Sequence, residues 1–120
     1  MSVEVNANNF AEEVLKAPGP VLVDFYGEHC LPCKLLRPIL TQLSEEHENL
    51  KLCMFNTDRE PRESNDELEK KFALLTHFQV MNLPTILLFL GGEVRASIVG
   101  LHSREEILHI LSEKKISLHN

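Results

Sequence analysis

The sequence predicts an α/β domain built on a single mixed sheet, with helices on both faces of that sheet. Two observations carry this prediction. In the first half of the chain, apolar runs typical of buried strands alternate with helical repeats, as in parallel βαβ units. Near the end, two strand-like runs are separated only by Gly91-Gly92, which indicates an antiparallel hairpin. The chain has 120 residues, so we expect one domain over residues 1–120.

The first elements are a short strand near Val3 to Val5 and a helix after it. Either Asn8 or Asn9 can cap this helix, because a short polar side chain accepts the free N–H groups of a first turn. Phe10 and Val14 stand four residues apart, so both fall on one face. We expect that face to pack against the sheet.

A central strand is predicted over Val21 to Tyr26, after the helix-ending segment Pro18-Gly19-Pro20. Its residues are almost all apolar, which suits a strand buried on both faces, and Asp24 is the exception. A second helix begins between Cys30 and Cys33, and Pro38 inside it predicts a kink. The apolar residues of this helix recur at helical spacing: Leu35, Leu36, Ile39, Leu40 and Leu43.

Another buried strand is predicted over Leu50 to Asn56. Ser64 and Glu67 form a capping box that opens a third helix. The apolar stripe of that helix is predicted to be part of the core: Leu68, Phe72 and Leu75. The charged segment Asp58 to Lys71 is more typical of a solvated face than of a docking surface.

The hairpin strands are predicted over Thr85 to Leu90 and Glu93 to Val99. Ser103 and Glu106 form a second capping box. It opens a final helix whose inward residues are Ile107, Ile110 and Leu111.

Charge and hydropathy argue against several kinds of partner. The formal net charge of −6 disfavours nucleic acid and anionic membrane surfaces, both of which need clustered Lys and Arg. The longest apolar run, Ile86 to Leu90, is far too short to span a bilayer. The N-terminal residues show neither the basic nor the apolar region of a secretory signal. We therefore expect a cytoplasmic protein with no nucleic acid and no membrane among its partners.

The chain has three cysteines, which are too few for a disulfide framework, and their number is odd. Two of them form the motif Cys30-Leu31-Pro32-Cys33, which indicates redox or metal chemistry. A zinc site needs three or four ligands, and the sequence offers no second ligand pair of that kind. Two inert thiols on a helix are the other alternative. Cys53 stands in an apolar run and is predicted to be a buried core residue.

Dithiol exchange is the chemistry that this motif favours. Exchange needs one thiolate that attacks a disulfide and a second thiol that resolves the mixed disulfide. At a helix N-terminus, free N–H groups and the helix dipole stabilise the thiolate of the first cysteine. Pro32 suits a first helical position and stiffens the loop, because it lacks an N–H and has a preset φ. We expect Cys30 to attack and Cys33 to resolve, with no bound cofactor and no metal.

In order along the chain, several stretches resemble the thioredoxin family. Val21 to Lys34 resembles its buried-Asp strand and active-site turn, and Pro38 stands where the family kinks its second helix. Leu83-Pro84-Thr85 resembles its cis-proline loop, and Gly91-Gly92-Glu93-Val94 with Val99-Gly100 resembles its terminal hairpin. The resemblance covers essentially the whole chain. It implies the thioredoxin fold and an enzyme that exchanges thiols with protein disulfides, with reduction as the favoured direction.

The resemblance also implies roles for single residues. Asp24 matches the family's buried Asp and would accept the proton of the resolving Cys33, through water. The Leu83-Pro84 bond would be cis and lie beside the dithiol, and the backbone of Leu83 would pair with a substrate strand. The implied partners are disulfide-containing protein substrates and a reductase or other thiol donor, and we expect a monomer.

Two departures from the family lie beside the cysteines. The family usually has Trp where this chain has His29. A histidinium there would stabilise the Cys30 thiolate and make the protein more oxidising, whereas a solvated imidazole would have little effect. Leu31 stands where the family typically has Gly and places an apolar group beside the dithiol. We expect His29, Leu31 and Pro32 to tune the redox properties.

Two further departures lie elsewhere in the chain. Met54 replaces a Lys that commonly neighbours the buried Asp, so Asp24 is expected to be more basic. Arg59 to Lys70 looks like an insertion that extends the third helix. The lost Trp and this longer helix leave an alternative open, a redox-inert thioredoxin-fold binding or assembly module.

Overall fold

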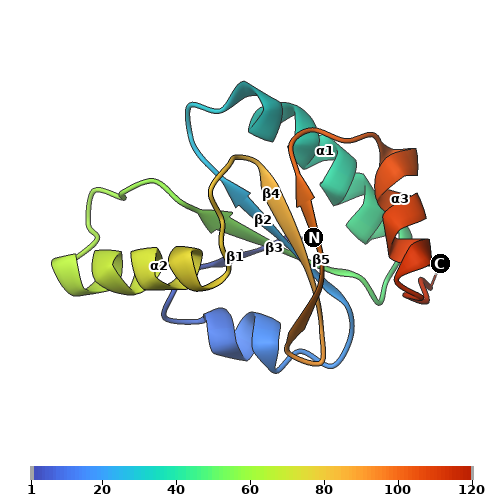
Figure 1. The fold of residues 1–120 in the computed structure, drawn as a ribbon, viewed down its shortest axis with the longest axis horizontal. Helices are drawn as coiled ribbons and strands as arrows, with labels where there is room; N and C mark the ends of the chain where they lie inside the picture. The colour runs from blue at the N-terminus through green and yellow to red at the C-terminus, as the bar shows by residue number, and fades with distance from the viewer. Residues whose placement is uncertain (1, 120) are drawn as a thin grey trace.

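The computed structural model describes residues 2–119, which form one five-stranded sheet in the order β1-β3-β2-β4-β5 (Figure 1). The element order confirms the predicted alternation of strands and helices. The elements are β1 (Ser2–Val5), η1 (Ala11–Leu15), β2 (Val21–Tyr26), α1 (Leu31–Glu46), β3 (Lys51–Asn56), α2 (Asn65–His77), β4 (Thr85–Leu90), β5 (Glu93–Val99) and α3 (Arg104–Glu113).

The sheet is mixed, as predicted. β1 and β2 both pair parallel with β3, whereas β4 pairs antiparallel with β2 and β5 pairs antiparallel with β4. All six residues of β2 are buried, which fits its apolar sequence and its central place. The hairpin turn has positive φ at Gly91 and Gly92, 61° and 80°, a conformation that glycine adopts without strain.

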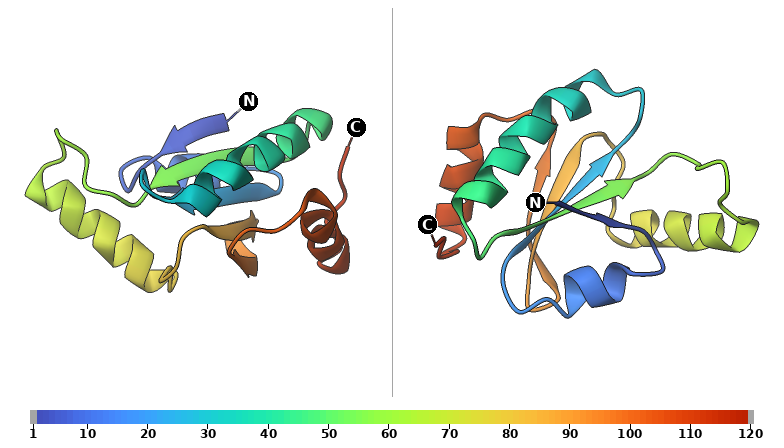
Figure 2. Two further views of the ribbon diagram at one scale, coloured as in Figure 1. Left: turned by 90° about the horizontal axis from the view of Figure 1, so that it is seen from above. Right: turned by 180° about the vertical axis from the view of Figure 1, so that it is seen from behind.

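Helices cover both faces of the sheet (Figures 1 and 2). α1 and α3 pack on one face, and η1 and α2 pack on the other. Alternate residues of β2 divide between the two cores: Leu22 and Tyr26 belong to the α1/α3 core, and Val23 and Phe25 to the η1/α2 core. By the same alternation, Asp24 faces α1, the helix that carries the cysteines.

The first helix differs from its prediction at its start. It is a single π-helical turn with Phe10 at the N-cap, and no side chain caps it, so capping by Asn8 or Asn9 is wrong. The side chain of Asn9 instead accepts the backbone N–H of Asn6 at 2.7 Å, which closes the turn before the helix. Phe10 and Val14 are both buried, as their spacing predicts.

α2 matches its predicted apolar stripe only in part: Leu75 packs against the core and Leu68 is partly buried, but Phe72 is not in the core. Phe72 is 54% exposed, and Lys71 beside it is only 2% exposed. The amine of Lys71 lies 2.8 Å from Glu63 and donates to the carbonyl of Asp58, so its charge is satisfied inside the protein. The placement of Phe72 in the core is therefore wrong, because the buried ion pair takes the position next to it.

The remaining helix predictions hold with small differences. Both capping boxes form, at Ser64 and at Ser103. In α3, Ile107 and Leu111 are buried, and Ile110 is partly buried. Pro38 lies inside α1 as expected, and the bend that it should cause stays a prediction.

Candidate active site

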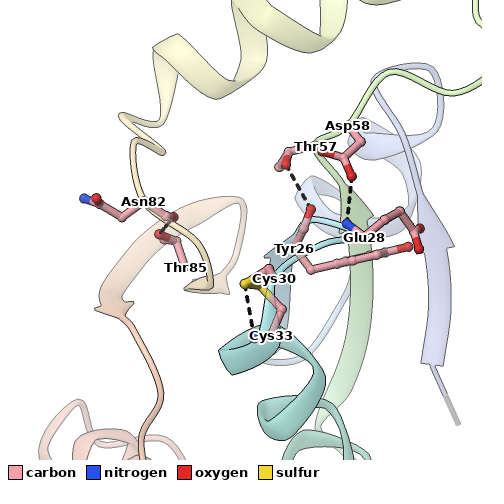
Figure 3. Close-up of a disulfide and its surroundings, with 8 residues drawn as sticks. All are labelled: Tyr26, Glu28, Cys30, Cys33, Thr57, Asp58, Asn82 and Thr85. Carbon is pink, nitrogen blue, oxygen red and sulfur yellow. Dashed lines mark hydrogen bonds between the residues drawn. A yellow bond between two sulfur atoms is a disulfide. The ribbon is translucent and has the colours of Figure 1, made fainter.

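The two cysteines of the motif lie at the start of α1 and form a disulfide (Figure 3). Cys30 is the N-cap residue, and Pro32 in the first turn suits a helix start. The backbone N–H of Cys33 donates to Cys30 Sγ at 3.2 Å. Cys30 is partly exposed, whereas Cys33 is 3% exposed. The arrangement presents one sulfur to solvent beside a helix N-terminus and holds the second behind it.

The turn before Cys30 is tied to the segment after β3 (Figure 3). The backbone N–H of Glu28 donates to Asp58 Oδ2 at 2.7 Å. The hydroxyl of Thr57 donates to the carbonyl of Tyr26 at 2.9 Å. These bonds fix the chain direction between β2 and the first cysteine.

The loop before β4 closes the other side of the site. The Leu83-Pro84 bond is cis, as the resemblance implied. The hydroxyl of Thr85 donates to the carbonyl of Asn82 at 2.6 Å (Figure 3). The side chain of Leu83 lies against Gly27, where an added Cβ would come within 3.0 Å of Leu83 Cδ1. The loop therefore lies against the active-site turn, with Leu83 36% exposed.

Asp24 is fully buried, and among the described residues neither of its carboxylate oxygens has a hydrogen-bond partner. Its neighbours in the sheet are Met54 on β3 and Ile86 on β4, both apolar. Burial raises the pKa of Asp24 to about 7, and Glu4 raises it as well, while the charge of Arg37 lowers it. This carboxyl therefore changes its protonation near neutral pH.

A cavity of about 130 Å³ lies between α1 and the end of β2. It is lined by Tyr26, Gly27, Glu28, Cys33, Lys34 and Arg37. The cavity gives the buried Cys33 a small space that it shares with polar side chains and that is large enough for water.

Comparison with known proteins decides the family. The thioredoxin family model matches residues 1–113. The chain belongs to the thioredoxin family. It is 36% identical to a thioredoxin of Rickettsia bellii over 109 residues, which cover 90% of this chain and 93% of that protein. It is 36% identical to a thioredoxin of Pseudomonas aeruginosa over 110 residues, which cover 91% of this chain and 92% of that protein.

A third relative is a longer protein. The chain is 32% identical to a bifunctional thioredoxin reductase/thioredoxin of Mycobacterium leprae over 114 residues, 94% of this chain and 22% of that protein. Family membership and the Cys30–Cys33 pair together make the chain a thiol–disulfide oxidoreductase that reduces protein disulfides.

The structure places the three residues that the resemblance singled out near the site: His29, Leu31 and Met54. His29 and Leu31 are both exposed beside the dithiol, Leu31 by 67%. His29 lines an open groove with residues of the segment after β3. Met54 lies in register with Asp24, so the β3 neighbour of this carboxyl is apolar.

Cys53, the third cysteine of the chain, is a core residue, as predicted. Its side chain is fully buried on β3, and burial raises the pKa of its thiol to about 11.

No group of three or more potential metal-ligating side chains occurs within residues 2–119. None of the helices over the same residues has the length and apolar character needed to cross a membrane.

Sequence reasoning missed two groups around this site. Arg37 and Glu4 are the charged residues that act on Asp24, from α1 and β1. Arg37 follows Cys33 by four residues, a spacing that puts both on one side of a helix, and this was the one available signal.

Proposed function

We propose that Cys30 attacks the substrate disulfide, that Cys33 resolves the mixed disulfide, and that Asp24 takes the proton of Cys33. The observation that carries this assignment is the difference in exposure between the two sulfurs. Cys30 is partly exposed and accepts a backbone N–H at the helix N-terminus, whereas Cys33 is buried on the side that Asp24 faces.

The reaction has two exchange steps. The Cys30 thiolate forms a bond to one substrate sulfur, and the other substrate sulfur leaves as a thiolate. Cys33 then loses its proton to Asp24 and attacks Cys30 Sγ, which releases the second substrate thiolate. Two electrons have moved to the substrate, and the protein is left with the Cys30–Cys33 disulfide.

The position of the loop at Leu83 and Pro84 supports a binding site for the substrate chain beside the dithiol. It lies against the active-site turn and leaves part of the Leu83 side chain exposed. We propose that the backbone of Leu83 pairs with an extended substrate segment, which aligns the disulfide with Cys30. Leu31 adds an exposed apolar side chain at the same site and narrows the range of substrates.

We further propose that His29, Leu31 and Pro32 tune the redox potential. Pro32 does so by holding the first turn of α1, and His29 does so by a positive charge near the thiolate.

The electron donor in this proposal is a reductase or another protein thiol. One relative is named as a bifunctional thioredoxin reductase/thioredoxin, which supports a reductase as donor. A monomer acting in the cytoplasm is part of the same proposal.

The test is the reduction of a protein disulfide such as that of insulin, with dithiothreitol as donor. We expect the wild type to accelerate the reaction and the double variant Cys30→Ser/Cys33→Ser to leave it at the uncatalysed rate. Cys53→Ser is the matched control and is expected to retain activity, because Cys53 is buried on β3. A wild type that leaves the reaction at the uncatalysed rate, as the double variant does, would instead favour a redox-inert binding module.

A further inference from the structure

Asp24 lies where a neighbouring charge acts strongly. It is fully buried, its sheet neighbours Met54 and Ile86 are apolar, and within the described residues its oxygens have no hydrogen bond. In such surroundings water screens charges poorly, so a cation or anion a short distance away changes the stability of the carboxylate.

The charged and polar groups on the face of the sheet where Asp24 lies come mainly from α1, β1 and β2. α1 supplies Arg37, β1 supplies Glu4, and the hydroxyl of Tyr26 comes from β2 itself. Glu28 and Lys34 are exposed residues of the same cavity. The buried residues that β3, β4 and α3 bring to this core are all apolar: Leu52, Met54, Ile86, Leu88, Ile107 and Leu111.

Tyr26 joins the two charged residues. The guanidinium carbon of Arg37 lies 4.6 Å from the centre of the Tyr26 ring, a cation–π distance. The Tyr26 hydroxyl donates to Glu4 Oε1 at 2.8 Å. Tyr26 is buried, so one fixed side chain contacts both a cation and an anion. Glu4 and Arg37 are exposed residues, and Glu4 lies in register with Asp24 through Met54 on β3. Arg37 also shares the cavity with Cys33, the residue whose proton has to leave.

We propose that Arg37 and Glu4, held by Tyr26, are positioning residues that set the charge state of Asp24 with opposite signs and thereby the pH range of the resolving step. This inference rests on the proposed role of Asp24 as proton acceptor of Cys33. Arg37 supplies the positive charge from α1 that Met54 on β3 does not supply.

The direct test is the titration of the Asp24 carboxyl carbon by NMR in the reduced protein. We expect Arg37→Gln to raise its midpoint and Glu4→Gln to lower it. Glu4→Gln keeps an acceptor for the Tyr26 hydroxyl, so its effect isolates the charge. Arg37→Lys is expected to restore most of the wild-type midpoint. Arg95→Gln on β5 is the control for net charge and is expected to leave the midpoint unchanged, because Arg95 lies three residues along β5 from Ile98, the residue in register with Asp24 through Ile86.

A second readout is the pH dependence of the rate at which the substrate thiolate is released from its mixed disulfide with Cys30. A rise of about 0.5 in the midpoint makes the resolving step about threefold slower below the midpoint, since the ionised fraction falls by that factor. We expect Arg37→Gln to show this slowing and Glu4→Gln to show the reverse.

Two results would overturn the inference. One is an Asp24 midpoint that neither variant moves. The other is a shift in the same direction in both variants, which a loss of packing around Tyr26 would produce and opposite charges would not. Failure of the proposed function looks different: the profile of Asp24→Asn would then match the wild type, while the Asp24 midpoint would still report on Arg37 and Glu4.

Discussion

Lys71 Nζ lies 2.8 Å from Glu63 Oε2, in an ion pair whose side chains are only 3% and 7% exposed. Lys71 also donates to the carbonyl of Asp58. The carboxylate of Asp58 accepts the N–H of Glu28, two residues before Cys30. The ion pair thus anchors the segment after β3, which in turn supports the active-site turn.

Lys71→Met is therefore expected to destabilise the protein, because it leaves the buried Glu63 carboxylate without its partner. Breaking a buried pair in this way costs about 3 kcal/mol. Urea unfolding at pH 7 measures the loss. Lys70→Met is the matched control, since Lys70 is exposed. The double variant Glu63→Gln/Lys71→Met is expected to recover part of the stability, and a single Lys71→Met variant as stable as the Lys70 control would contradict this account.

Asp24 is expected to make stability depend on pH. The pKa of Asp24 is raised in the folded protein from the ordinary 3.8 to about 7. The protonated Asp24 therefore favours the folded state, and this contribution to the free energy of unfolding is full below pH 3.8 and is lost as pH rises through 7. The difference between these two values corresponds to about 4 kcal/mol. Asp24→Asn removes this dependence. We expect its stability relative to the wild type to increase between pH 4 and pH 8 in chemical unfolding, and a constant difference would rule out the titration.

The order of attack is tested by trapping. Cys33→Ser removes the resolving thiol, so a mixed disulfide through Cys30 is expected to accumulate with an oxidised protein substrate. Cys30→Ser is expected to trap far less, because Cys33 is 3% exposed. Both variants carry Cys53→Ser to remove the third thiol, and mass spectrometry counts the adducts. Equal trapping by the two variants would show that exposure does not select the nucleophile.

His29→Trp is expected to lower the reduction potential of the dithiol. The exposed His29 precedes Cys30, and the substitution removes the imidazole that we propose stabilises the reduced thiolate. His77→Trp on α2 is the matched control, since His77 is exposed at the end of a different helix. Equilibration with glutathione measures the reduction potentials of both variants. A potential unchanged by His29→Trp would mean that the imidazole does not affect the stability of the Cys30 thiolate.

Much of this fold follows from local rules. The continuous apolar run of β2 required a central strand, Gly91-Gly92 required a tight turn, and the two capping boxes formed where their Ser and Glu residues stand. The dithiol was also visible, because both cysteines and the helix N-terminus lie within a few residues. Such features need only neighbours in sequence.

The rest needed contacts between distant segments. Helical spacing favoured Phe72 for the core, and only the positions of Glu63 and Asp58 show why Lys71 is buried instead. In the same way, Arg37 and Glu4 are 33 positions apart and meet around Tyr26 only after β1 and α1 pack on β2. Periodicity finds the faces of an element but does not say which charge from another element will meet them.

The reduction potential of the Cys30–Cys33 pair, measured against a series of glutathione ratios, tests the central claim most directly. A protein that reduces other proteins is predicted to have a potential near the roughly −270 mV of thioredoxin, raised somewhat above that value by His29. A value between about −180 and −120 mV would contradict the account, since a dithiol at that potential oxidises or isomerises its substrates.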